Sequence, residues 1–239
     1  MTNLKKESNI ELIVRLRKEL HNIPERSMHE VKTKQTLIHF IETHTQSLEI
    51  VDMDQWFYVV KKGKCDDHPI AFRADYDAVT CADGCPRHLC GHDGHSAVLA
   101  GFSLWLDTAQ LERDVYLIFQ PGEENGMGAA IAQGLSVHIF RVEEFPATIN
   151  DKECVDKIWK IAHRLNQKVT YAEEPFRWSE DFGYYLQKTK GAFIGIGCGV
   201  DYPALHTMEY EFDDEIIESV IGIYKEISAL NHMNNSIFF

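Results

Sequence analysis

The chain has 239 residues, of which 44% are hydrophobic and 26% charged, a balance typical of a soluble globular protein with one sizeable core. It contains 24 Lys and Arg and 37 Asp and Glu. The resulting formal net charge of -13 argues against nucleic acid or an anionic membrane as a partner. No apolar run approaches the roughly 20 residues of a membrane span. The N-terminal stretch lacks the apolar block of a signal peptide, and six cysteines are too few for a disulfide scaffold. We therefore expect a cytoplasmic protein whose cysteines are free thiols or metal ligands.

Two helices are predicted at the start of the chain. Ser8 and Glu11 have the spacing of a capping box, and apolar residues follow them at near-helical steps until Pro24 closes the segment. Ser27 and Glu30 repeat this spacing. They predict that a second helix opens there.

Strands and helices then alternate along the chain. Strands are predicted, in chain order, at 56–60, 69–75, 115–119, 137–142 and 191–199. Helices are predicted at 96–106, which is apolar nearly all round, at 128–135, from a cap at Asn150 or Asp151 through Leu165, at 179–186 and at 212–227. This order predicts a single α/β domain over residues 1–239, with a mostly parallel sheet and helices on both faces. In such sheets the functional site lies beyond the carboxyl ends of the strands.

The densest group of metal-binding side chains is HLCGHDGH, residues 88–95. On an extended segment, the two-residue step from Cys90 to His92 puts both side chains on the same side. A thiolate and an imidazole are good ligands for Zn, Mn, Co or Ni, and the two glycines let the backbone bend so that the ligands converge. Asp93 also fits as the N-cap of the following helix. The density of the cluster favours metal binding over a capped helix start with incidental histidines.

Carboxylates and one more histidine follow other predicted strands. Glu123 and Glu124 point in different directions at a strand end, so one can bind a metal while the other faces its open coordination position. That layout suits metal-assisted hydrolysis, in which a non-ligand carboxylate takes the proton of a water acidified by the ion. His206 precedes the last helix, and it is a candidate metal ligand only in combination with these groups. Asp75 and Asp77 share one face of a strand end, where we expect them to hold a ligand imidazole by its second nitrogen.

In combination, these motifs resemble a known family, the dinuclear-metal amidohydrolases and peptidases. This family includes aminoacylases, hippurate hydrolase, auxin-conjugate hydrolases and N-acetyldiaminopimelate deacetylase. The resemblance runs from about Leu20 to the last helix and is carried by segments 20–33, 71–79, 88–95, 119–129, 145–151, 178–182 and 205–214. It implies a catalytic domain with a zinc-exopeptidase-like fold.

The resemblance also implies roles for individual residues. Two divalent cations (Mn, Zn, Co or Ni) would be held by Cys90, which would bridge them, and by His92, Glu124 and His206. Glu123 would be the general base. The expected reaction is hydrolysis of the amide bond of an N-acyl amino acid, a small-molecule substrate.

The chain departs from the family at one place. Family members carry a lid domain inserted in the catalytic domain, which mediates dimerisation and helps hold the developing oxyanion. Here the segment 128–135 leads directly into residues that resemble the exit of the lid, so we expect the lid to be missing near 135–137. A strand with another histidine ligand is missing as well, and His138 beside the join is interpreted as a strand residue rather than its replacement. The oligomeric state stays open, and weak activity is expected.

Three alternatives remain. The chain can be a non-catalytic, metal-binding remnant, or a metallo-exopeptidase that acts on dipeptides. A lower-ranked alternative is a structural zinc site formed by Cys81, Cys85, His88 and Cys90, whose spacing is not that of a standard zinc knuckle.

Overall fold

The computed structural model of the protein describes residues 7–125, 146–172, 176, 180–230 and 236–238. The predicted helix 128–135, the predicted strand 137–142, the join at 135–137 and His138 lie outside these residues. None of the described helices combines the length and the apolar character that a membrane crossing requires.

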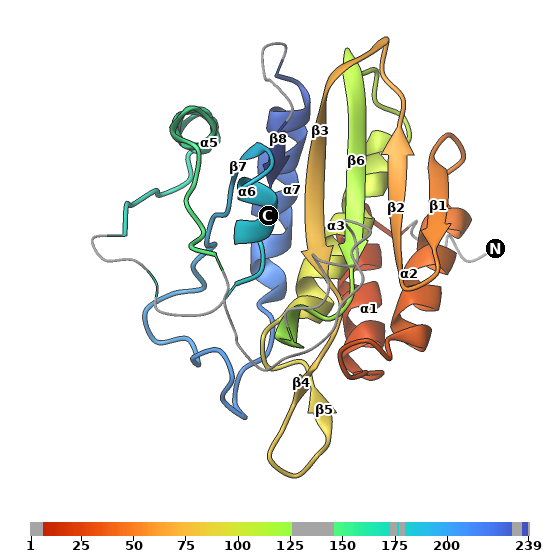
Figure 1. The fold of residues 1–239 in the computed structure, drawn as a ribbon, viewed down its shortest axis with the longest axis vertical. Coiled ribbons are helices and arrows are strands. Elements are labelled where there is room, and N and C mark those ends of the chain that lie inside the picture. The colour runs from red at the N-terminus through yellow and green to blue at the C-terminus, as the bar shows by residue number, and fades with distance from the viewer. Residues whose placement is uncertain (1–6, 126–145, 173–175, 177–179, 231–235, 239) are drawn as a thin grey trace, which may run out of the picture.

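A six-stranded sheet in the order β1-β2-β6-β3-β8-β7 forms the centre of the described structure (Figure 1). Its strands are β1 (Glu49–Met53), β2 (Trp56–Lys61), β3 (Cys65–Asp75), β6 (Arg113–Gln120), β7 (Lys190–Ala192) and β8 (Ser236–Phe238). The β3–β6, β3–β8 and β7–β8 pairs are parallel, whereas β1–β2 and β2–β6 are antiparallel. The mostly parallel α/β sheet expected from the sequence is confirmed. The edge strand β1 and the inner strand β8, which lies between β3 and β7, were not predicted.

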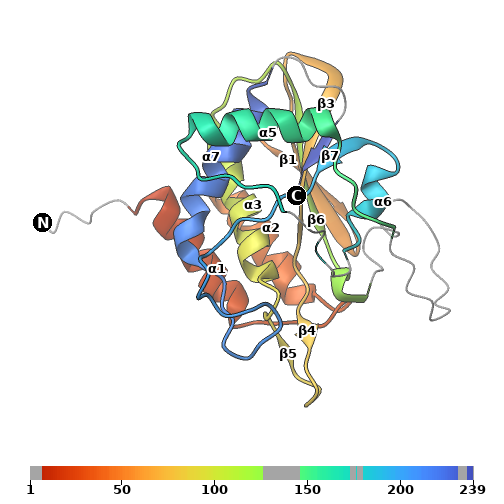
Figure 2. The same cartoon turned by 90° about the vertical axis from the view of Figure 1, so that its left-hand side faces the viewer.

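Most of the helices cover one face of the sheet (Figure 2). They are α1 (Asn9–His21), α2 (Val31–His44), α3 (His92–Leu106), α5 (Lys152–Arg164) and α7 (Ile217–Ser228). The main core lies between them and the sheet. Phe72 of β3 lies in this core. The centroid of its ring is 5.2 Å from that of Phe102 in α3 and 4.6 Å from that of Tyr224 in α7. The helix predicted at 96–106 is confirmed as buried, and it begins earlier, at His92.

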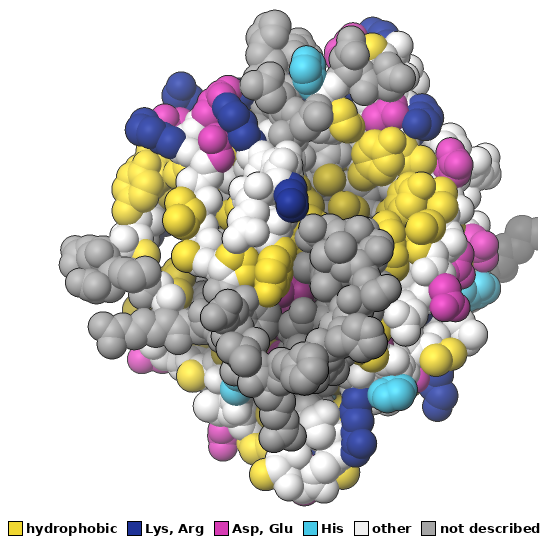
Figure 3. All heavy atoms as spheres, in the orientation of Figure 1, with side chains coloured by type: hydrophobic (Ala, Val, Ile, Leu, Met, Phe, Trp, Pro, Cys, Tyr) yellow, Lys and Arg dark blue, Asp and Glu magenta, His cyan; other side chains and the backbone are white. Residues whose placement is uncertain are grey.

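The opposite face of the sheet is covered less evenly by the described residues. The short helix α6 (Gly183–Leu186) packs there, in a small core of Phe182, Tyr185 and Ile237. Over β2 and β6 the same face carries aromatic side chains, and Figure 3 shows hydrophobic groups gathered in this part of the molecule. Tyr58 stands between two of them, with ring centroids 5.6 Å from Trp56 and 6.0 Å from Tyr116. Helices thus lie on both faces, as expected, but in unequal number.

The two predicted capping boxes had different outcomes. At α1 the box is confirmed, because Ser8 Oγ accepts from Glu11 N and Glu11 Oε2 accepts from Ser8 N at 2.7 Å. At α2 it is wrong, because Glu30 is itself the N-cap and has no side-chain capping bond. Ser27 Oγ instead donates to Asp77 Oδ2 at 2.6 Å, and Glu30 Oε1 accepts from Gly122 N at 2.9 Å. Partners from distant segments outcompete the local box.

Glu30 should make the stability of the protein depend measurably on pH. Burial and repulsion from Asp77 raise the pKa of Glu30 to about 7, above its ordinary value of 4.5. The folded protein therefore keeps this proton at pH values where the unfolded chain has lost it, and stability falls as the pH rises from about 4.5 to 7. We expect Glu30→Gln to be on the order of 2 kcal/mol more stable than the unsubstituted protein at pH 8, and not at pH 4. Urea denaturation of metal-free protein at both pH values measures this. Glu42→Gln, at an exposed position of the same helix, should show no such gain, and an equal gain in both variants would contradict the prediction.

The predicted strand 191–199 is wrong beyond Ala192, where β7 ends. The backbone groups of the next residue, Phe193, bind the side chain of Asn150 instead of a strand. This side chain accepts from Phe193 N and donates to Phe193 O, both at 2.8 Å. Asp151 is the N-cap of α5, as one of the two predicted alternatives, and accepts from Cys154 N at 3.0 Å. The glycine-rich segment after Phe193 therefore leaves the sheet. The last predicted helix is confirmed as α7, preceded by a 3-10 turn at Asp214–Ile216.

Candidate metal centre

The polar motifs meet at the carboxyl ends of two central parallel strands. β3 and β6 end side by side, with Asp75 opposite Gln120. Asp77 follows β3, and a 3-10 turn at Glu123–Asn125 follows β6. The first residue of α3, His92, lies against Asp77, with 3.0 Å between Nδ1 and Oδ1. This is the edge at which the sequence placed the site.

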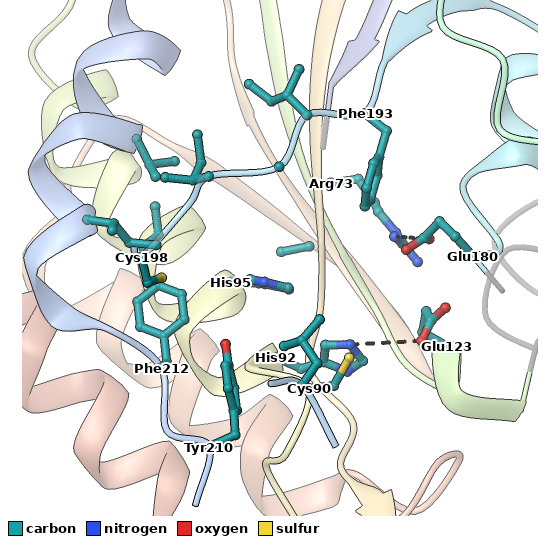
Figure 4. Close-up of a pocket in the computed structure, with 18 of the residues that line it drawn as sticks. Arg73, Cys90, His92, His95, Glu123, Glu180, Phe193, Cys198, Tyr210 and Phe212 are labelled. Carbon is teal, nitrogen blue, oxygen red and sulfur yellow. Dashed lines mark hydrogen bonds and ion pairs between the residues drawn. The ribbon is translucent and has the colours of Figure 1, made fainter. Parts of the chain in front are cut away.

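The candidate metal centre is formed by Cys90, His92, Glu124 and His206, with Glu123 beside them. Ligand atoms of Cys90, Glu124 and His206 lie within 4.8 Å of one another, and so do those of His92, Glu123 and Glu124. His92 Nε2 is 3.8 Å from Glu124 Oε1, which is 4.0 Å from His206 Nε2. Figure 4 shows the Cys90 and His92 side chains together, to the left of Glu123.

The donor set and its surroundings fit a divalent cation. One thiol, two imidazoles and one carboxylate are ligands of the kind that Zn, Co or Ni accept. Glu124 Oε1, the atom nearest both imidazoles, is buried and has no hydrogen-bond partner within the described structure. A buried carboxylate oxygen without a partner is costly, and a cation at this point would satisfy it.

Gly91 brings Cys90 and His92 together by a mechanism that differs from the predicted one. The segment is not extended, because Gly91 adopts a left-handed φ of 83° as the N-cap of α3. A Cβ at this position would meet the Tyr210 hydroxyl at 2.7 Å. The prediction that Asp93 is the N-cap is wrong. Asp93 lies inside the first turn of α3, and its Oδ2 is 2.7 Å from Nδ1 of His21.

His206 is held at the centre by its backbone. Its N–H donates to the carbonyl of Leu89 at 2.7 Å, which ties the loop before α7 to the segment that carries Cys90. His206 has a left-handed φ of 66°, which is unusual for a residue with a Cβ. Its side chain is 56% exposed, against 17% for Glu124, so it closes the outer side of the centre.

Asp77 orients two of the other residues. Its Oδ1 lies 3.0 Å from His92 Nδ1, which leaves Nε2 of that ring facing the two glutamates. Its Oδ2 accepts from Glu124 N at 3.0 Å and from the Ser27 hydroxyl. Burial works against the charge of Asp77, yet the His92 hydrogen bond and charge hold the pKa of Asp77 below its ordinary value. The expected contact between this aspartate and an imidazole is present, whereas Asp75 forms an ion pair with Arg73.

Glu123 lies in surroundings suited to proton transfer. Its Oε2 is 3.8 Å from His92 Nε2, and its side chain is 9% exposed. Burial, followed by repulsion from Glu180, raises the pKa of Glu123 to about 8. A carboxyl group with a pKa in this range can both accept and donate a proton near neutral pH.

The sequence interpretation missed the network around Arg73, which is fully buried. Its guanidinium contacts Asp75, lies 3.2 Å from Glu180 Oε1 and donates to Asp181 Oδ1 at 2.6 Å. Gln120 at the end of β6 donates to the other oxygen of Asp181 at 2.8 Å. Glu180 and Asp181 belong to the segment 178–182 of the family resemblance and to the helix predicted at 179–186, which the structure shows only from Gly183 to Leu186, and neither residue was assigned a role at the site. No pattern around Arg73 signalled that three acids from two segments would share it.

The alternative zinc site is not assembled. Cys81 and Cys85 lie on the hairpin formed by β4 (Val79–Thr80) and β5 (Pro86–Arg87), joined by a backbone bond from Cys81 N to Cys85 O. Over the residues that the structure describes, no group of potential ligands within 4.8 Å contains either cysteine, and Cys90 groups with Glu124 and His206 instead.

Comparisons with curated proteins return deacetylases. N-acetyldiaminopimelate deacetylase of Bacillus subtilis (strain 168) is 31% identical over 133 residues, which are 50% of this chain and 35% of that protein. N-acetylcysteine deacetylase of the same strain is 35% identical over 133 residues, 49% of this chain and 34% of that protein. The chain therefore spans about a third of the length of the curated relatives that it matches.

Solved structures extend the likeness of fold over nearly the whole chain. The YXEP protein of Bacillus subtilis, described as a dinuclear metal binding peptidase from the M20 family, superposes with a TM-score of 0.78 at 20% identity and covers 94% of this chain and 98% of that chain. A leucine aminopeptidase precursor from Bacteroides thetaiotaomicron gives a TM-score of 0.63 at 14% identity, covering 98% of this chain and 100% of that chain. At these identities the likeness concerns the fold alone.

The match to a family model carries the classification. The model of peptidase family M20/M25/M40 matches residues 71–144 and 134–229, which include every residue of the candidate metal centre. Because these ranges together span more than half of the sequence, the chain belongs to peptidase family M20/M25/M40.

Proposed function

We propose that the chain is the catalytic domain of a metal-dependent amidohydrolase that removes the acyl group of an N-acyl amino acid. Cys90, His92, Glu124 and His206 hold divalent cations in this proposal, and Glu123 is the general base. The observation that carries it is the convergence of these side chains on the buried Oε1 of Glu124, which accepts no hydrogen bond from the residues that the structure describes. The deacetylases among the relatives support the choice of an amide substrate.

Each residue near the centre has a distinct part in this mechanism. A divalent cation in the centre would lower the pKa of a water molecule there. Glu123 takes a proton from the attacking water and delivers it to the leaving amine, a double role that its raised pKa allows. Asp77 keeps Nε2 of His92 turned toward the centre. Glu180, anchored by Arg73, faces Glu123 and opposes its ionisation.

The domain organisation is part of the proposal. A single catalytic domain over residues 1–239, without the lid, accounts for a family match whose two ranges, 71–144 and 134–229, meet at the expected join. Loss of the lid removes one source of oxyanion stabilisation, and the loss of one such donor costs on the order of 100- to 1,000-fold in rate. Weak turnover is therefore expected, and the oligomeric state must be measured directly.

A panel of substrates tests the function. We expect the protein loaded with Mn, Zn, Co or Ni to release amine from N-acyl amino acids, and a chelator to abolish this release. Metal analysis of the purified protein should give up to two ions per chain. Cleavage of dipeptides alone would instead identify an exopeptidase. No hydrolysis of any substrate with any of the four metals would identify a non-catalytic metal-binding domain.

Asp77→Asn should weaken metal binding about 10- to 100-fold, as is usual for residues that orient a metal-binding histidine. The amide replaces one carboxylate oxygen with a donor, and Asp77 accepts from Glu124 N, from Ser27 and from His92. One of these bonds must therefore be lost. Competition titration with a chromogenic chelator measures the change in Kd.

The matched control is Asp83→Asn on the hairpin between β4 and β5, where the carboxylate pairs with Arg87 at the surface. This variant should bind metal as the unsubstituted protein does. Unchanged affinity in Asp77→Asn would remove the reason for placing the metal on Nε2 of His92.

A further inference from the structure

A cavity of about 660 Å³ adjoins the candidate metal centre, and its two ends differ in chemistry. Cys90, His92, Glu123 and Glu124 line one end. The other end extends between α3, α7 and the segment that follows β7. Figure 4 shows His95 at its middle, with Phe193 above it and Cys198 to its left. Cavities of roughly 300–1,000 Å³ hold whole ligands of drug size, so an acetyl group would leave most of this space unfilled.

A single face of α7 provides much of the apolar end. Val220, Ile223 and Tyr224 of α7 line the cavity, as does Ile216, its N-cap, and their spacing places them in one stripe. Val98 of α3 and the Phe212 ring complete this wall. The stripe is the same amphipathic pattern that predicted the helix. Part of its apolar face thus borders the cavity as well as the core.

The charges in the lining decide which part of a substrate this end accepts. Arg73 is the one Lys or Arg among the described lining residues, and its guanidinium is already shared by Asp75, Glu180 and Asp181. Within the part of the lining that the structure describes, the apolar end therefore offers no Lys or Arg side chain to pair with the carboxylate of an amino acid. An acyl chain carries no charge that needs a partner, and removing its apolar surface from water is favourable.

We infer that the acyl group of the substrate is a long aliphatic one, which occupies the apolar end while the amide carbonyl lies at the metal centre. This inference rests on the proposed function and specifies its substrate class. It differs from the acetyl groups named for the relatives. Each methylene group buried in the cavity should tighten binding about fourfold, the equivalent of about 0.8 kcal/mol.

Binding of two matched ligands tests the inference without requiring turnover. In zinc-loaded Glu123→Gln protein, calorimetry compares N-octanoylglycine with N-acetylglycine. We expect the octanoyl ligand to bind at least about 100-fold more tightly, since six additional methylenes are buried. Equal dissociation constants, within threefold, would overturn the inference.

Two glycines of the segment after β7 provide a matched pair of variants. Gly195 lines the cavity and Gly197 does not, and a Cβ added at either position meets nothing within 4 Å. In the same Glu123→Gln background, Gly195→Phe should reduce the octanoyl-to-acetyl affinity ratio at least tenfold, and Gly197→Phe should leave it unchanged. Val220→Phe, which adds bulk from α7, should act like Gly195→Phe. A similar change in both glycine variants would refute the assignment of the cavity.

The binding test and the substrate panel can fail independently, because the first tests the acyl cavity and the second tests the enzymatic function. If the unsubstituted protein hydrolyses no acyl amino acid but the octanoyl preference and its loss in Gly195→Phe are observed, the cavity assignment stands and the enzymatic function falls. If acetyl and octanoyl ligands bind equally and both are hydrolysed, the enzymatic function stands and the acyl-cavity inference falls.

Discussion

Replacing Glu123 with Gln is expected to lower kcat for amide hydrolysis about 10³-fold while leaving the metal content unchanged. The amide has nearly the shape of the carboxyl group but cannot take a proton from water. Glu123 is not among the four proposed metal ligands, and its Oε2 lies 3.8 Å from His92 Nε2. Initial rates with an N-acyl amino acid and metal analysis of the same preparations measure both quantities.

Two comparisons sharpen this result. Glu112→Gln, which removes a carboxylate at an exposed position before β6, should keep full activity and so control for loss of charge. Glu124→Gln should lose metal and activity together, because Glu124 is a proposed ligand. If Glu123→Gln instead lost its metal, Glu123 would be a ligand and the assignment of the two glutamates would be reversed.

Arg73→Met is expected to lower the free energy of unfolding by about 3–5 kcal/mol, a large part of the total stability of a typical domain. The substitution leaves Asp75, Glu180 and Asp181 at the end of β3 without the cation that they share. Asp75 and Asp181 are fully buried, so water cannot replace that charge. Urea denaturation followed by circular dichroism measures the loss.

The cause can be separated from simple loss of packing by varying pH. Protonation removes the unpaired charges, so the deficit of Arg73→Met relative to the unsubstituted protein should shrink as the pH is lowered. A deficit that stays constant between pH 8 and pH 5 would contradict the electrostatic explanation. Arg87→Met provides the control, because Arg87 pairs with Asp83 at the surface and its loss should leave stability nearly unchanged.

Local sequence patterns were reliable where one element could satisfy its own requirements. The apolar runs 56–60, 69–75 and 115–119 became β2, β3 and β6, because runs of this kind favour the inner strands of a sheet, where at least one face packs against the core. The Ser8 capping box formed because its donors and acceptors belong to residues only three positions apart. The same spacing at Ser27 failed, since Asp77 and Gly122 offered these side chains partners that no local pattern reveals.

The sequence by itself determined the fold class, the edge of the sheet where the site lies and the residue types that gather there. These follow from the alternation of strands and helices and from polar motifs placed directly after apolar strands.

Only the tertiary structure decided how those residues meet. Cys90 and His92 converge because Gly91 turns the chain into α3, and His206 joins them because its backbone binds Leu89. The shared cation at Arg73 and the cavity beside α7 depend on segments that are more than 100 residues apart, as in the pair Arg73–Glu180. Contacts at that separation arise from the packing of the whole chain, and a local pattern of side chains carries no record of them.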